Sequence, residues 1–118
     1  MSKSLIVQKY GGTSVGTLER IEHVADRIGK VRKTGVDIVV VVSAMAGETD
    51  KLLKMARSLS KNPARREVDM LLSSGERISA ALLVLALQSR GIPALSMTGR
   101  QIGLQTDSTH SRARIINI

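Results

Sequence analysis

The order of apolar and polar positions predicts a strand, a helix and a second strand in the first 42 residues. The apolar run over 5–8 is expected to be a short buried strand, and residues 38–42 are a continuous β-branched run. Such a run is typical of a parallel strand covered by helices on both faces. Between them, apolar residues recur at helical spacing over 18–31, with Thr17 placed as the N-cap and Gly35 as the end. The pattern predicts a right-handed βαβ unit.

The rest of the chain is expected to alternate helices with short strands and loops. The expected elements are helices over 52–59, 65–73 and 76–88, strands over 93–97 and 114–118, and a loop over 98–111. The segment 78–87 is apolar nearly all round, which is typical of a helix at the centre of a domain. Neither an internal repeat nor a linker interrupts the chain. The whole pattern predicts an α/β fold with a parallel core.

Length and composition are those of one globular domain. The chain has 118 residues, 42% of them apolar and 24% charged. It contains no cysteine, which excludes disulfides and thiolate metal sites, and its two histidines argue against a multi-histidine metal site. Its apolar runs are too short for a secretion signal or a membrane span. We therefore expect a cytoplasmic protein that does not enter a membrane.

The net charge points to an anionic partner. Eighteen Lys and Arg against ten Asp and Glu give +8, which suits nucleic acid, a phosphorylated metabolite or an acidic membrane surface. Tyr10 is the only aromatic residue, so no base-stacking platform for single strands can form. Duplex binding through the phosphate backbone stays open, but the basic residues are scattered over several helices. We therefore expect no nucleic-acid partner.

The strongest local signal follows the first strand. Residues 9–14 read Lys9-Tyr10-Gly11-Gly12-Thr13-Ser14 and precede a helix. Paired glycines let main-chain N–H groups approach a ligand, the helix N-terminus favours an anion, and the lysine adds a full charge. The spacing fits neither the P-loop nor the dinucleotide fingerprint. A phosphate-binding loop and a tight turn beside a solvated lysine both remain open.

Three further polar clusters are candidates for chemistry. Ser43 and Thr49, after the second strand, are placed to bind a small polar substrate, although Thr49 or Asp50 could instead cap the next helix. Glu76, expected at a helix start, suits either the helix dipole or a substrate ammonium group. The segment 106–114 is a polar loop with one histidine. No hydrolase, zinc-protease or calcium-loop pattern is present.

Taken together, the motifs resemble the N-terminal part of the aspartate kinases, within the amino acid kinase family. The segments that carry the resemblance are Lys9–Ser14, Val41–Met45 with Thr49-Asp50, Ser74–Glu76, Thr98-Gly99 and Thr106-Asp107. The resemblance runs through all 118 residues. It implies a three-layer αβα sandwich with a mainly parallel sheet, truncated after about half of the kinase domain. Residues 1–118 would be the amino-acid-binding part, without the nucleotide-binding half or ACT regulatory domains, and inactive alone.

The resemblance also implies a reaction and its residues. These kinases transfer the γ-phosphoryl group of ATP to the β-carboxylate of L-aspartate, the first step toward lysine, threonine and methionine. By resemblance, Lys9 is catalytic and contacts ATP phosphates together with Tyr10, Gly11 and Gly12. Aspartate would be bound by Ser43, Thr49 and Glu76, with Glu76 nearest its amino group. Mg²⁺ would arrive with ATP, no protein metal site is expected, and the full-length enzyme would be a homo-oligomer.

Other functions remain open at this point. The same family contains N-acetylglutamate, glutamate and uridylate kinases, although the residue pattern at 9–14 and 74–76 fits aspartate kinases better. A basic nucleic-acid-binding module would show duplex binding that falls steeply with salt. A fragment that only binds a partner subunit would associate with itself or with others.

Overall fold

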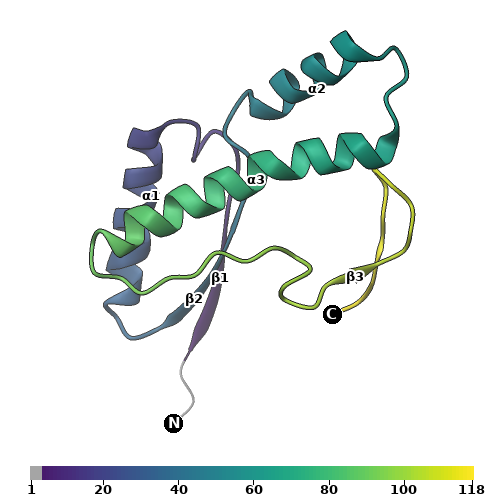
Figure 1. Ribbon diagram of the computed structural model, residues 1–118. Helices are drawn as coiled ribbons and strands as arrows, with labels where there is room; N and C mark the ends of the chain where they lie inside the picture. The colour runs from purple at the N-terminus through teal and green to yellow at the C-terminus, as the bar shows by residue number, and fades with distance from the viewer. Residues whose placement is uncertain (1–3) are drawn as a thin grey trace.

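The computed structural model describes residues 4–118 as a small sheet with helices packed beside it and a separate C-terminal hairpin (Figure 1). The elements are β1 (Leu5–Tyr10), α1 (Leu18–Arg32), β2 (Asp37–Val42), α2 (Glu48–Leu59), α3 (Arg65–Gln88), β3 (Gln105–Thr106) and β4 (Ile115–Asn117). The expected domain boundary at residue 1 lies outside the described residues.

The first two strands form the predicted βαβ unit. β1 and β2 pair in parallel, in a register that runs from Leu5 opposite Asp37 to Tyr10 opposite Val42. β1 is two residues longer than the apolar pattern indicates, so Lys9 and Tyr10 belong to the strand. The prediction of an α/β fold with a parallel sheet is confirmed.

One face of this sheet is packed and the other is open. Ile38, Val40 and Val42 lie against the core that α1 and α3 build, whereas Val39 and Val41 on the opposite face are 48% and 46% exposed. The prediction of burial on both faces of this strand, and of a buried first strand, is therefore wrong for residues 4–118. Covering the second face requires another layer, and the described residues place helices against one face only.

Helix α1 forms where its pattern places it. The Thr17 hydroxyl accepts a hydrogen bond from the Arg20 N–H at 3.2 Å, and the chain leaves the helix through Gly35 at φ +91°. This φ favours glycine, which has no side chain to clash. The apolar face of α1 packs against α3, and Asp26 of α1 accepts a hydrogen bond from Arg90 just beyond α3 at 2.7 Å.

Helix α3 is one continuous helix of 24 residues, so the prediction of a break at residues 73–75 is wrong. The hydroxyls of Ser73 and Ser74 donate to carbonyls one turn earlier in the same helix, so both are satisfied without a break in the helix. Gly75 is buried against Ala44, and this contact compensates for its low helix propensity. Glu76 therefore lies inside the helix and not at its start.

The surface of α3 is only partly covered. Its buried residues are Gly75, Ser79, Leu83 and Leu87, while Ile78 and Leu85 are exposed, so the expected burial all round is wrong. α3 is the one described helix long and apolar enough to cross a membrane by length and composition. The core helix of a globular protein passes the same test, and α3 packs on both α1 and α2.

The C-terminal third differs from the expected strand and loop. Residues 93–97 form no strand, because no described strand lies beside them to supply hydrogen bonds; Leu95 is 79% exposed. β3 lies inside the expected loop and pairs antiparallel with β4, which confirms the strand expected near the end of the sequence. This hairpin lies beside the amino-terminal part of α3 (Figure 1).

Candidate functional site

The carboxyl ends of β1 and β2 hold two loops against each other (Figure 1). The Ser43 N–H donates to the Tyr10 carbonyl, and the Ala46 N–H donates to the Gly12 carbonyl, both at 3.1 Å. The loop after β1 is thereby bonded to the loop after β2. In open α/β sheets ligands bind at this edge, so the loops form the centre of the candidate site.

The two adjacent glycines differ in what surrounds them. A Cβ atom on Gly12 would lie 2.8 Å from the Ala44 carbonyl oxygen, whereas one on Gly11 would have nothing within 4 Å. Gly12 is therefore required for the contact between the two loops. Gly11 leaves its side of the main chain open to a ligand.

Lys9 and Tyr10 point to opposite faces of β1. The Tyr10 ring is buried in the core, and its hydroxyl donates to Gln8 Oε1 at 2.9 Å. Lys9 is exposed, and its side chain makes no hydrogen bond or ion pair within residues 4–118. The ammonium group of Lys9 is therefore free to meet an anion, while Tyr10 can offer a ligand only its main chain or the edge of its ring.

Helix α3 joins this site through a buried serine. The Ser79 hydroxyl donates to the Ser43 carbonyl at 2.6 Å and lies 3.0 Å from the Glu76 carbonyl. One turn earlier, a Cβ on Gly75 would lie 3.1 Å from the Ala44 Cβ. The structure thus brings together Ser43 and Glu76, which are 33 positions apart in the printed sequence. Ser79 was not among the residues predicted from the sequence. The one feature that could have identified it is a hydroxyl group within an apolar helical segment.

Thr49 and Glu76 are both exposed and lie on neighbouring helices. α2 begins at Glu48 with Gly47 as its N-cap, so the alternative in which Thr49 or Asp50 caps this helix is wrong. Glu48 Cγ would lie 3.5 Å from a Cβ on Gly75, which places the start of α2 against α3. No hydrogen bond or ion pair links the side chains of Lys9, Thr49 and Glu76 across the described part of the chain.

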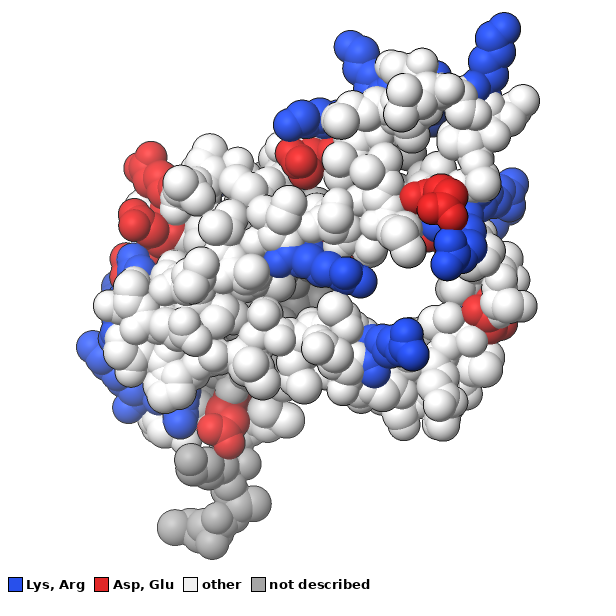
Figure 2. All heavy atoms as spheres, in the orientation of Figure 1, with Lys and Arg blue, Asp and Glu red and all other residues white. Residues whose placement is uncertain are grey.

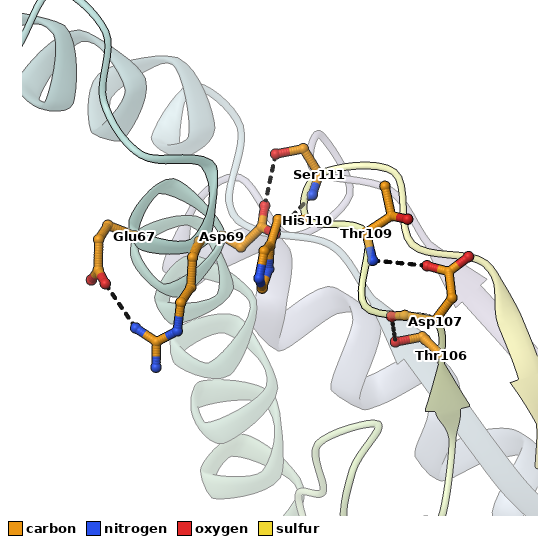
Figure 3. Close-up of polar contacts among 8 residues, drawn as sticks. Glu67, Asp69, Thr106, Asp107, Thr109, His110 and Ser111 are labelled. Atoms are coloured by element: carbon orange, nitrogen blue, oxygen red, sulfur yellow. Dashed lines mark hydrogen bonds and ion pairs between the residues drawn. The ribbon is translucent and has the colours of Figure 1, made fainter.

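A second polar cluster ties the C-terminal hairpin to α3 (Figure 3). Asp69 accepts hydrogen bonds from the Ser111 N–H at 2.8 Å and the Ser111 hydroxyl at 3.1 Å, and His110 Nδ1 lies 3.5 Å away. The Ser111 N–H bond, chiefly, lowers the pKa of Asp69 below its ordinary 3.8. The serine bonds the carboxylate and not the imidazole, so this cluster is not arranged as a nucleophile with its base.

Of two hollows in the surface, one lies away from the glycine loops and the other borders the loop after β1 through Tyr10 and Ser14. The larger, about 460 Å³, is formed by α2 alone, and a second of about 250 Å³ lies over α1. The residues of the second hollow are Tyr10, Ser14, Arg20, His23, Val24 and Arg27. Within residues 4–118 no three His, Asp or Glu side chains gather to hold a metal ion. On the face shown in Figure 2, Lys and Arg side chains lie in several separate places, some of them beside an opening between α3 and the C-terminal segment.

Comparison with known proteins gives a consistent result. An aspartate kinase of Stutzerimonas stutzeri is 56% identical over 115 residues, which are 98% of this chain and 28% of that protein. An aspartokinase of Geobacillus stearothermophilus is 53% identical over 114 residues, 97% of this chain and 28% of that protein. The chain thus spans a little over a quarter of the length of these relatives.

Solved structures agree in fold. The crystal structure of aspartate kinase from Synechocystis superposes with a TM-score of 0.80 and 59% identity, over 83% of this chain and 17% of that one. Aspartokinase III of E. coli, crystallised with aspartate and ADP, gives a TM-score of 0.75 at 22% identity, over 95% of this chain and 35% of that one. The amino acid kinase family matches residues 4–117, and the chain therefore belongs to the amino acid kinase family.

Proposed function

We propose that this chain is the amino-acid-binding part of an aspartate kinase, which transfers the ATP γ-phosphoryl group to the β-carboxylate of L-aspartate. The observation that carries the proposal is that the main chains of Gly12, Ser43 and Glu76 come together near one sheet edge, through the Gly12–Ala44 contact and the contacts of Ser79 with Ser43 and Glu76. Relatives named aspartate kinase or aspartokinase at 53% to 56% identity support this choice of substrate over other acceptors in the family.

Aspartate is assigned to Ser43, Thr49 and Glu76. The Glu76 carboxylate is exposed and has no ion pair within residues 4–118, so its charge is available to a substrate ammonium group. Ser43 and Thr49 offer hydroxyl groups, which donate to carboxylate oxygens. These three side chains come from the β2 loop, α2 and α3, which the Gly75 and Ser79 contacts hold together.

ATP phosphates are assigned to Lys9 and to the main chain of Tyr10, Gly11 and Gly12. The unpaired Lys9 ammonium supplies the charge that a transferring phosphoryl group requires, and we propose it as the catalytic residue. Gly11 has no side chain, and no atom lies within 4 Å of the place a Cβ would occupy. Phosphate oxygens can therefore approach its main chain. The Tyr10 side chain packs in the core, so the assignment of this residue to ATP rests on its main chain.

The chemistry requires no general base. A β-carboxylate has an ordinary pKa near ~3.9 and is ionised at neutral pH. One of its oxygens bonds to the γ-phosphorus while the bond from that phosphorus to the ADP oxygen breaks, giving 4-phospho-L-aspartate and ADP. Mg²⁺ bound to ATP would neutralise charge on the phosphate oxygens during this transfer.

Location and assembly belong to the same proposal. We place the enzyme in the cytoplasm, where ATP and free aspartate are available, at the start of lysine, threonine and methionine synthesis. We propose a homo-oligomer for the complete polypeptide. We propose no nucleic-acid partner, because the basic residues are scattered over several helices of the sequence.

The test is a coupled assay on the complete polypeptide that carries this sequence. ADP release and hydroxamate trapping of the acyl phosphate are measured with ATP and each of aspartate, glutamate, N-acetylglutamate and uridylate. Turnover with aspartate, and with none of the other three acceptors, supports the proposal. Turnover with another acceptor, and none with aspartate, assigns a different kinase of the family. The 118-residue chain assayed in parallel is expected to be inactive.

A further inference from the structure

We propose that Ser79 is a positioning residue that sets the geometry of the amino acid site through main-chain contacts. The inference rests on the function proposed above. Ser79 is fully buried, the only polar residue among the buried side chains of residues 4–118. Its hydroxyl donates to the Ser43 carbonyl at 2.6 Å, across 36 positions of sequence. A hydroxyl in an apolar interior is costly unless it is bonded, so this bond fixes its direction.

The same oxygen touches the main chain of two of the three residues assigned to aspartate, Ser43 and Glu76. It lies 3.0 Å from the Glu76 carbonyl, one turn earlier in α3, as well as against the Ser43 carbonyl. The Ser43 peptide plane is therefore fixed relative to the turn of helix that carries Glu76. Because Ser43 and Glu76 would contact the two ends of one small substrate, the hydroxyl sets their relative placement.

Small residues make this contact possible. Gly75 and Ser79 are four positions apart and so lie on one side of α3. A Cβ on Gly75 would already lie 3.1 Å from the Ala44 Cβ, so a larger residue here would push α3 away from the end of β2. Close approach by Gly75 thus brings the Ser79 hydroxyl within bonding distance of the Ser43 carbonyl.

A positioning role makes a prediction that packing alone does not. Ser79→Ala removes the bond and leaves the Ser43 carbonyl without this donor. We expect the aspartate KM to rise about 2- to 10-fold, the range that one hydrogen bond corresponds to, while the ATP KM stays unchanged. Ser79→Cys replaces the hydroxyl with a thiol, which is slightly larger and a weak donor, and its aspartate KM should fall between those of wild type and Ser79→Ala.

Ser89→Ala is the matched control. Ser89 also bonds a carbonyl three positions earlier in the same segment, but it is exposed and touches neither β2 nor the glycine loops. The three variants are compared in the complete polypeptide by steady-state kinetics, with melting temperature as the check on folding. If Ser79→Ala does not fold, Ser79→Cys carries the comparison.

The outcomes separate this inference from the proposed function. A wild-type protein without aspartate-dependent turnover overturns the function. An active wild type whose Ser79→Ala and Ser79→Cys variants keep the wild-type aspartate KM overturns the positioning role alone. Equal rises in the KM values for aspartate and ATP also overturn it, because they indicate a general loss of structure.

Discussion

A Cβ atom on Gly12 would lie 2.8 Å from the carbonyl oxygen of Ala44, closer than side-chain carbons approach backbone oxygens in folded proteins. The neighbour is main chain, which cannot rotate away as a side chain can. The Gly12 carbonyl also accepts from the Ala46 N–H in the same contact. The two loops at the carboxyl edge of the sheet are therefore held at a separation that only glycine at position 12 permits.

Gly12→Ala should separate these loops. The expected loss in unfolding free energy is about 1–3 kcal/mol, the usual cost of overpacking a close contact. Gly11→Ala is the matched control for stability, because a Cβ there meets nothing within 4 Å. Chemical denaturation of the two variants measures the difference. Equal stability of both would show that the loops can move apart at no cost.

Lys9→Ala should lower kcat of the complete polypeptide by about 10²- to 10³-fold, as loss of one group that stabilises transition-state charge does. The aspartate KM should change little, since the ammonium acts on the transferring phosphoryl group. The Lys9 side chain makes no ion pair or hydrogen bond within residues 4–118, so the melting temperature should be unchanged. Lys61→Ala, in the turn after α2, removes the same charge elsewhere. An unaltered kcat in Lys9→Ala would remove this lysine from the mechanism.

Glu76→Gln tests the ammonium contact. The side chain is exposed and unpaired within residues 4–118, so its replacement should leave the protein folded. Loss of a charged hydrogen bond to the substrate should raise the aspartate KM about tenfold or more. Glu22→Gln, on the exposed face of α1, is the control. A Glu76→Gln enzyme with the aspartate KM of wild type would place the substrate amino group elsewhere.

The local elements could be predicted from sequence, because local rules determine them. The helical spacing over 18–31 and the Thr17 cap identify α1, and the β-branched run at 38–42 identifies β2. The glycine pair correctly marked the carboxyl edge of the sheet. The sequence suggests that both glycines open the main chain to a ligand. At Gly12 that explanation is incomplete, since the closest neighbour of its Cβ position is the Ala44 main chain.

What the sequence did not reveal depends on contacts between distant residues. Ser73-Ser74-Gly75 has the composition of a break, but packing of Gly75 on Ala44 and the bond from Ser79 to Ser43 favour a continuous α3. Residues 93–97 have the composition of a strand, but strand formation needs a partner, which the described residues do not offer there. Composition alone reveals neither the contacts between distant residues nor the presence of a partner strand.

The attachment of the C-terminal hairpin to α3 should depend on pH through Asp69. Its carboxylate accepts both the N–H and the hydroxyl of Ser111, and the N–H bond is the main cause of a pKa below the ordinary 3.8 (Figure 3). A depressed pKa in the folded state means that the ionised form stabilises the attached hairpin. This contribution is complete well above pH 3.8 and is lost as the pH falls through the lowered value.

Hydrogen exchange of peptides covering residues 107–114, corrected for intrinsic rates, measures this attachment between pH 2.5 and 6. Protection should be constant in the upper part of this range. It should decrease once the pH is lowered below 3.8, the ordinary pKa of an aspartate. Asp69→Asn should show the low protection at every pH, because the amide lacks the charge and one acceptor oxygen. Asp26→Asn, which loses only the contact to Arg90, is the control and should retain the wild-type profile in this segment. Protection in Asp69→Asn that matches wild type at pH 6 would show that Asp69 does not hold the hairpin.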